Sequence, residues 1–200
     1  MFGLWTPRKS DDEVLIAASG RGDTEAFDEL IRKYEKRVYN FAYRLTGNSS
    51  DAADVAQEAF IRAYKSIKSF RGDSTFTTWM YRITTNIYLD TRKKASFGKV
   101  TSLEERAERK ENGRSTEIAD PAPAPEEMAI TEERRKIIRE AVNSLPEQHR
   151  VVITLFRFEE RTYEEIASIL NIPVGTVKSR INRAGLALAK ILQARKDELF

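Results

Sequence analysis

Apolar residues recur at steps of three and four along most of the chain, and this spacing constrains the fold more than any other feature. Because an α-helix has about 3.6 residues per turn, such residues fall on one face of a helix. No stretch of any length alternates between apolar and polar residues as a half-buried strand does. The sequence therefore predicts an all-α protein. The clearest stripe comprises Phe27, Leu30, Ile31, Tyr34, Val38, Phe41 and Leu45.

Residues 10–95 are expected to form one small helical domain. A short helix over Asp11–Ser19 should end at Gly20, and the long striped helix should end at Gly47-Asn48. The next helix is expected to begin near Ser50 or Asp51, whose side chains can cap its amides. Its apolar face comprises Ala52, Ala56, Ala59, Phe60, Ala63 and Ile67. A further helix from about Thr77 to Lys94 would turn Trp79, Met80, Ile83 and Ile87 inward.

The helical pattern fails between the two halves of the chain. Residues 96–130 are rich in Pro, Ala, Gly and charged residues, with 5 Lys+Arg against 8 Asp+Glu, a net charge of −3. The segments 1–95 and 131–200 each carry a net charge of +3. Alternating prolines favour an extended spacer. The sequence thus predicts a flexible acidic linker over 96–130, with a short helix around Leu103–Glu111, between domains at 10–95 and 131–200.

The most specific local motif lies near the C-terminus. Thr162-Tyr163-Glu164-Glu165 fits a capping box, Asn171-Ile172-Pro173 fits a tight turn, and a second helix begins near Val174. A short helix, a turn and a helix with a small-polar and basic outer face match the helix-turn-helix that docks in the DNA major groove. The alternative is a plain helical hairpin with a solvated charged face. The DNA-contact candidates are Thr176, Lys178, Ser179, Arg180, Asn182 and Arg183.

Aromatic, hydroxyl and amide residues gather around a turn-rich loop in the N-terminal half. Residues 72–86 mix these with an arginine, a combination suited to holding unstacked bases of single-stranded DNA. Arg92-Lys93-Lys94 can meet phosphate, or can complement the dipole at the end of a helix. The alternative is that Trp79 and Tyr81 belong to the core, and this is the preferred interpretation for Trp79 because it lies on the apolar stripe. The candidates for DNA contact in this region are Asp73, Ser74, Thr75, Arg82, Asn86, Arg92 and Lys93.

Composition excludes several other classes of protein. The chain has no cysteine, which favours a reducing compartment, and no apolar run near the roughly 20 residues of a membrane span. We therefore expect a cytoplasmic protein without membrane contact. The single histidine, His149, is expected on the surface, and neither a phosphate-binding glycine loop nor a metal-ligand cluster is present in the sequence. No cofactor, metal site or catalytic activity is predicted.

Both halves of the sequence resemble extracytoplasmic-function (ECF) sigma factors, the promoter-specificity subunits of bacterial RNA polymerase. Asp51–Tyr64, Phe70–Gly72 and Phe76–Asn86 resemble region 2 of that family. Leu145–Arg150, Tyr163–Ala167 and Pro173–Arg180 resemble region 4. The resemblance covers most of residues 24–95 and 131–193, in the order found in the family.

The resemblance implies partners and roles. Region 2 would bind the β′ coiled coil of core RNA polymerase through Asp51, Asp54, Gln57, Glu58 and Arg62. Its loop Phe70–Thr75, which adds Phe70 and Arg71 to the DNA-contact candidates, would capture a flipped base of the −10 element on the non-template single strand. Asn86 would contact a neighbouring base. Region 4 would read the −35 duplex and meet the β flap, while the acidic linker would thread the channels of the enzyme. An anti-sigma factor and a response to stress or envelope signals are also implied.

Two points qualify this interpretation. Asp90 stands where some relatives carry an amide or a basic residue, and no DNA contact is assigned to it because a carboxylate repels phosphate. A stand-alone helix-turn-helix regulator is the alternative function. Such a regulator would bind its site tightly without polymerase, usually as a dimer on a two-fold site.

Overall fold

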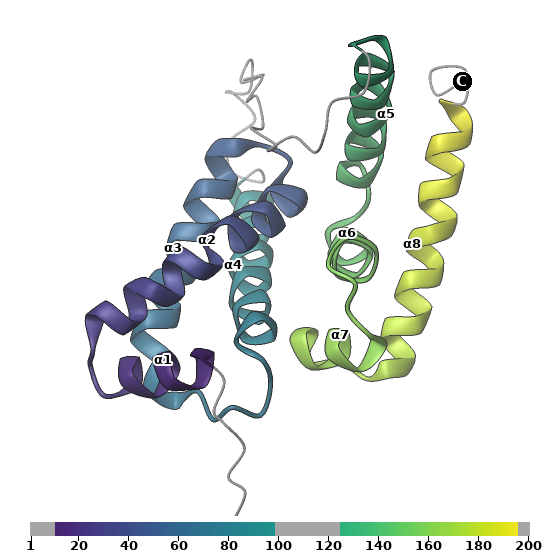
Figure 1. The fold of residues 1–200 in the computed structure, drawn as a ribbon. Helices are drawn as coiled ribbons and strands as arrows, with labels where there is room; N and C mark the ends of the chain where they lie inside the picture. The colour runs from purple at the N-terminus through teal and green to yellow at the C-terminus, as the bar shows by residue number, and fades with distance from the viewer. Residues whose placement is uncertain (1–10, 99–124, 196–200) are drawn as a thin grey trace, which may run out of the picture.

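Helices account for all regular structure in the described part of the chain. The computed structural model describes residues 11–98 and 125–195, and no strand occurs in these ranges. Four helices form an N-terminal bundle (residues 11–98) and four form a C-terminal bundle (residues 125–195), as Figure 1 shows. The helices are α1 (Asp11–Gly20), α2 (Thr24–Thr46), α3 (Ser49–Ser66), α4 (Phe76–Gly98), α5 (Pro125–Asn143), α6 (Glu147–Ile153), α7 (Tyr163–Leu170) and α8 (Val174–Ala194). The predicted all-α fold is confirmed.

Local capping residues set the ends of the helices in the N-terminal bundle. The Asp23 side chain accepts a hydrogen bond from the backbone N–H of Ala26 at 3.1 Å and starts α2. Gly47, with φ of 82°, ends it in the left-handed conformation that glycine adopts without strain. The cap of α3 was predicted at Ser50 or Asp51, which is wrong. Asn48 caps the helix instead, because its Oδ1 accepts the Asp51 N–H at 2.7 Å.

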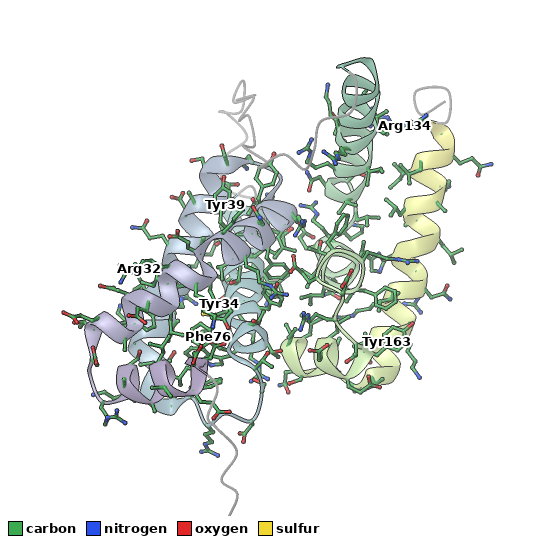
Figure 2. The ribbon with its side chains drawn as sticks, in the orientation of Figure 1. Arg32, Tyr34, Tyr39, Phe76, Arg134 and Tyr163 are labelled. Atoms are coloured by element: carbon green, nitrogen blue, oxygen red, sulfur yellow. The ribbon has the colours of Figure 1, made fainter. Side chains whose placement is uncertain are left out.

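The core of the N-terminal bundle is built from the predicted stripes. Leu30 and Val38 of α2 pack against the alanine face of α3, and Met80 and Ile87 of α4 complete the cluster. Tyr34 and Phe76 lie side by side between α2 and α4, with ring centroids 4.9 Å apart (Figure 2). The alanines on α3 let the neighbouring helices approach closely, so that the larger side chains of α2 and α4 fill the space between the helices.

The C-terminal bundle follows the predicted helix-turn-helix closely, but its first helix begins inside the predicted linker. Helix α5 begins at Pro125, not near Thr131, since proline is tolerated in the first turn of a helix. Pro146 occupies the N-cap position of α6 and makes no side-chain capping bond. Most of the predicted linker over 96–130, including the proposed short helix Leu103–Glu111, lies outside the described residues.

The two bundles share a hydrophobic core, which the sequence did not predict. Phe41 and Leu45 at the end of α2, with Tyr81 and Tyr88 of α4, pack against Leu155 and other apolar residues of the C-terminal bundle. Helix α6 lies between α4 and α8 in this arrangement (Figure 1). Helix α4 therefore has two buried faces, one in each core. None of the helices within residues 11–98 and 125–195 has the length and apolar character needed to cross a bilayer.

Candidate nucleic-acid interface

The helix-turn-helix is held rigid by its capping and its turn. The Thr162 hydroxyl accepts the Glu165 N–H at 3.2 Å, while the Glu165 carboxylate accepts the Thr162 N–H at 2.8 Å. This reciprocal capping box starts α7. Asn171, with φ of 52° and ψ of 50°, turns the chain, and α8 begins two residues after Ile172. Ile166, Ile169 and Val177 are buried beneath the motif, which fixes the two helices against each other.

The predicted reading residues lie on the outer surface of α8. Ser179, Asn182 and Arg183 are exposed, as the helical spacing predicted, and Lys178 is exposed on the flank. Thr176 and Arg180 are half-buried. The Lys178 ammonium lies 5.8 Å from the centroid of the Tyr163 ring, which places it beside α7. The first turn of α8 contains no acidic residue, so its positive dipole end is free to attract phosphate.

The loop between α3 and α4 presents polar groups beside an aromatic cluster. Its turn contains Gly72, with φ of 77°. The half-buried Phe70 ring lies 5.0 Å from the Trp79 ring and 6.2 Å from the Phe76 ring, so Phe70 belongs partly to the core. The Thr75 hydroxyl accepts the Thr78 N–H at 3.2 Å and caps α4. In the same loop Arg71 and Asp73 are exposed and Ser74 is half-buried.

The candidate residues on α4 differ in exposure and in their contacts with the rest of the chain. Asn86 is exposed on the outer surface of the helix, and so is Lys93. Arg82 is half-buried and donates hydrogen bonds to the Ser168 carbonyl at 2.9 Å and the Ser168 hydroxyl at 3.0 Å. Arg92 donates to the Thr46 carbonyl at 3.3 Å. Two of the predicted DNA-contact arginines are therefore occupied within the chain.

The predicted polymerase-contact residues lie along the outer side of α3. Asp51, Asp54, Gln57 and Arg62 are exposed, and Glu58 is half-buried. The Arg62 guanidinium donates to the Glu58 carboxylate at 2.7 Å, one turn away. An open, mostly apolar groove runs beside this surface between α2 and α3. It is lined by Ile31, Glu35, Lys36, Tyr39, Ala53, Ala56, Gln57 and Phe60.

Polar residues that join the two bundles were not among the predicted sites. Glu159, only 6% exposed, receives hydrogen bonds from Arg44 of α2 and from the hydroxyl of Tyr81 of α4. Arg150 is also buried and donates to backbone carbonyls at the ends of α2 and α5. His149 was expected on the surface but is half-buried beside Arg150. One indication of these contacts was present in the sequence, namely the alternative interpretation that Tyr81 belongs to the core.

The fold and the two surfaces define a class of protein. A rigid helix-turn-helix is joined to a second helical bundle that combines an aromatic loop with an exposed amide. No group of residues in the described ranges could hold a metal ion. This combination is that of a two-part DNA-binding protein.

Comparison with known proteins identifies the family. The family model for Sigma-70 region 2 matches residues 30–97, and that for Sigma-70, region 4 matches residues 135–188. The ECF RNA polymerase sigma-E factor of Escherichia coli is 41% identical over 91% of this chain and 94% of its own length. The RNA polymerase sigma-H factor of Pseudomonas aeruginosa is 37% identical over 92% of this chain and 95% of its own length. The chain belongs to the sigma-70 family, in its ECF group.

A solved structure has the same fold. The sigma factor RpoE of Bartonella quintana, in complex with the anti-sigma factor NepR, matches with a TM-score of 0.65 and 22% identity. The match covers 84% of this chain and 96% of that one. As a sigma factor, the protein directs core RNA polymerase to promoters and is not an enzyme. The alternative of a stand-alone helix-turn-helix regulator is not favoured, because the chain also matches region 2.

Proposed function

We propose that the two bundles read different promoter elements, with α8 reading the −35 duplex and the α3–α4 loop with α4 capturing the unstacked −10 strand. The observation that carries this division is the exposure of Asn182 and Arg183 on α8 and of Asn86 on α4. Side chains of this kind recognise base edges, and polymerase would hold both contacts at a fixed spacing. Because the −10 bases bind only when they are flipped, their capture would favour the melted duplex.

At the −35 element, the exposed face of α8 suits the major groove. Arg183 can form paired hydrogen bonds with guanine, and Asn182 can do so with adenine. Ser179 lies one turn before them on the same face, and its hydroxyl donates a hydrogen bond to the Thr176 carbonyl at 2.9 Å. Lys178, Arg180 and Thr176 would contact phosphates on either side, which fixes the register of the helix without reading sequence.

At the −10 element, the loop would supply the pocket for a flipped base. Arg71, Asp73 and Thr75 are exposed around the half-buried Phe70 ring, so the loop offers an aromatic surface with polar groups at its rim. Asn86 and Lys93 continue this surface along α4. Arg82 and Arg92 would join it on release from their internal contacts. Aromatic stacking with peripheral cations is how proteins hold single-stranded bases.

We assign the β′ coiled coil to the outer side of α3. Exposed Asp51, Asp54 and Arg62 provide charged contacts and Gln57 a polar one, while the groove between α2 and α3 offers apolar contacts. Tyr64 and Ile61, 45% and 41% exposed, extend the apolar part of this surface. The C-terminal bundle would meet the β flap, and the acidic segment between the bundles would enter the channels that otherwise hold nucleic acid.

A regulatory partner and a cellular location belong to the same proposal. The Bartonella quintana relative was solved with an anti-sigma factor, which supports a partner of this class for our chain. Polymerase and promoter lie in the cytoplasm, so we place the protein there. A response to stress or envelope signals fits the ECF group, and transcript starts mapped after overexpression of the chain would reveal its promoters.

Two alanine variants test the division of labour. Arg183→Ala should reduce discrimination at the −35 element by about 5- to 150-fold, the equivalent of one paired base contact of about 1–3 kcal/mol. Asn86→Ala should leave −35 discrimination intact but weaken opening or discrimination at the −10 element. Transcription from mapped promoters with single-base changes in either element measures both effects.

Lys190→Ala is the matched control. Lys190 is exposed on α8 about two turns beyond Arg183, so the variant removes the same charge away from the proposed contact surface. It should transcribe normally. If Arg183→Ala and Asn86→Ala also transcribe normally from every promoter variant, the assignment of the two reading surfaces is wrong.

A further inference from the structure

The loop between α3 and α4 is supported from below by helix α1 and by a tyrosine of α2. The short helix Ile67–Ser69, which directly precedes Phe70, packs against α1. At the other end of the loop Phe76 begins α4, and its ring centroid lies 4.9 Å from that of Tyr34 (Figure 2). The Tyr34 hydroxyl in turn donates to Oδ2 of Asp12 on α1. Helix α1 therefore supports one end of the loop directly and the other end through Tyr34.

The hydrogen bond between Asp12 and Tyr34 is partly shielded from solvent. Tyr34 is 8% exposed, and the side chain of Asp12 is 27% exposed. The second carboxylate oxygen of Asp12, Oδ1, accepts from the ammonium of Lys33, whose side chain is 49% exposed. Burial alone would raise the pKa of Asp12, but the hydrogen bonds from Lys33 and Tyr34 hold it below its ordinary value of 3.8. Tyr34 thus bonds a carboxylate at neutral pH, and a charged acceptor makes a stronger hydrogen bond than a neutral one.

Aromatic contacts connect Tyr34 with the loop. The Phe76 ring centroid lies 6.2 Å from that of Phe70 and 5.6 Å from that of Trp79. The rings of Phe70 and Trp79 are 5.0 Å apart. Phe76 is buried, whereas Phe70 is half-buried and belongs to the aromatic surface of the proposed base pocket. Because a close-packed interior transmits small displacements, the position of Tyr34 influences that of Phe70.

We propose that Asp12 and Tyr34 are positioning residues for capture of the −10 base, because the hydrogen bond between them fixes the aromatic surface of the α3–α4 loop. Tyr34 is buried, so it acts through Phe76 and Phe70 and does not itself touch DNA. This inference rests on the proposed function, since it assumes that the loop holds a flipped base. It gives α1, which carries none of the proposed DNA or polymerase contacts, a role in promoter opening.

Two substitutions remove the hydrogen bond and retain every aromatic ring. Tyr34→Phe deletes only the donor hydroxyl, and Asp12→Ala deletes the acceptor. Residues that act on a binding site through other residues change its affinity by about 2- to 30-fold. We therefore expect each variant to weaken the selective binding of the −10 base about threefold or more.

Three variants serve as matched controls. Tyr43→Phe removes the hydroxyl of another tyrosine of α2, which is partly buried against the same core. Asp11→Ala removes an exposed carboxylate next to Asp12. Lys33→Met removes the ion pair of Asp12 but retains the hydrogen bond from Tyr34. All three should behave like the parent, and urea titration of every variant, followed by circular dichroism, establishes that it is folded.

The contribution of a single base to strand binding is the readout. Holoenzyme assembled from the full chain and core RNA polymerase is titrated with a fluorescent non-template oligonucleotide that carries the −10 element of a mapped promoter. The titration is repeated with oligonucleotides in which each −10 base in turn is replaced by an abasic site. At the position where removal weakens binding by the parent most, the ratio of the abasic to the intact dissociation constant measures base capture. Tyr34→Phe and Asp12→Ala should lower this ratio about threefold or more, while the controls should keep it within about twofold of the parent value.

The same titrations separate this inference from the proposed function. If no abasic site weakens binding by the parent, the loop captures no −10 base, and the proposed function fails together with the inference. If the parent captures a base and both Tyr34→Phe and Asp12→Ala keep its ratio, the inference fails while the proposed function stands. The inference also fails if these variants weaken the intact and abasic strands equally, or if Tyr43→Phe or Asp11→Ala lowers the ratio as much. The effect would then be one of general stability.

Discussion

Two buried tyrosines on the same face of α4 differ in one respect, which makes Tyr81→Phe a sharp test of the contact between the bundles. Tyr81 is fully buried, and its hydroxyl donates to Glu159 and accepts from Arg37. Tyr88, seven residues later, is just as buried, but its hydroxyl has no hydrogen-bond partner of normal geometry. Removing each hydroxyl therefore separates the effect of the hydrogen bonds from that of the ring.

The expected loss follows from the partners of each hydroxyl. A hydrogen bond to a charged group contributes about 1.5–3 kcal/mol, so Tyr81→Phe should reduce the free energy of unfolding by about 2 kcal/mol. Tyr88→Phe loses no such bond and leaves a more apolar group in the core. It should change the free energy of unfolding by less than about 0.5 kcal/mol, or increase it.

Urea titration of both variants, followed by circular dichroism, measures the difference. A lower midpoint for Tyr81→Phe alone, at an unchanged slope, supports the account. If the two variants lose the same stability within about 0.5 kcal/mol, the hydroxyl of Tyr81 contributes nothing specific and the reasoning is refuted.

The effect should also depend on pH. Burial, followed by the hydrogen bond to the Glu159 carboxylate, raises the pKa of Tyr81 above the ordinary value of 10.0. The folded state therefore favours the neutral hydroxyl. This contribution is fully present below pH 10.0 and declines as the pH rises toward the raised pKa. The stability difference between the parent and Tyr81→Phe should shrink at alkaline pH and stay constant from neutral pH up to the ordinary tyrosine pKa.

Three further variants, together with Gly20→Ala as a control, test local structure. Gly47→Ala should lose about 1–3 kcal/mol of unfolding free energy, because φ at this position is positive and the new Cβ would lie 2.5 Å from Asn143 Nδ2. Gly20→Ala, whose new Cβ would have nothing within 4 Å, should not destabilise the protein. Chemical denaturation measures both variants. Thr162→Ala should cost about 1 kcal/mol by the same assay through loss of the capping box. Although burial opposes ionisation, the Thr162 N–H and Arg161 lower the pKa of Glu165 below its ordinary 4.5. The stability lost in Glu165→Gln should therefore be present above pH 4.5 and vanish as an acid titration passes through the lowered pKa.

The local architecture was readable from the sequence because its causes are local. The stripe from Phe27 to Leu45 predicted α2, and Thr162 with Glu165 predicted the start of α7. The outward positions of Asn182 and Arg183 followed from helical spacing. Each of these features depends on residues within a few turns of one another, so periodicity and capping rules were sufficient.

The contact between the bundles was not readable because its partners are far apart in the chain. Glu159 meets Tyr81 across 78 residues and Arg44 across 115, and helical spacing carries no information about such pairs. Phe41 and Leu45, at the C-terminal end of the α2 stripe, were expected in the core of the N-terminal domain. They pack instead in the core that the two bundles share. Arg82 appeared free for DNA contact because its partner Ser168 lies in the other bundle.

The dependence of promoter binding on polymerase tests the central claim most directly. Promoter fragments from mapped transcript starts would be used in mobility-shift assays with the purified chain, with and without core RNA polymerase. A sigma factor that divides its reading between two bundles should bind the specific duplex well only with polymerase present. Equally tight and specific binding by the chain alone would contradict the account.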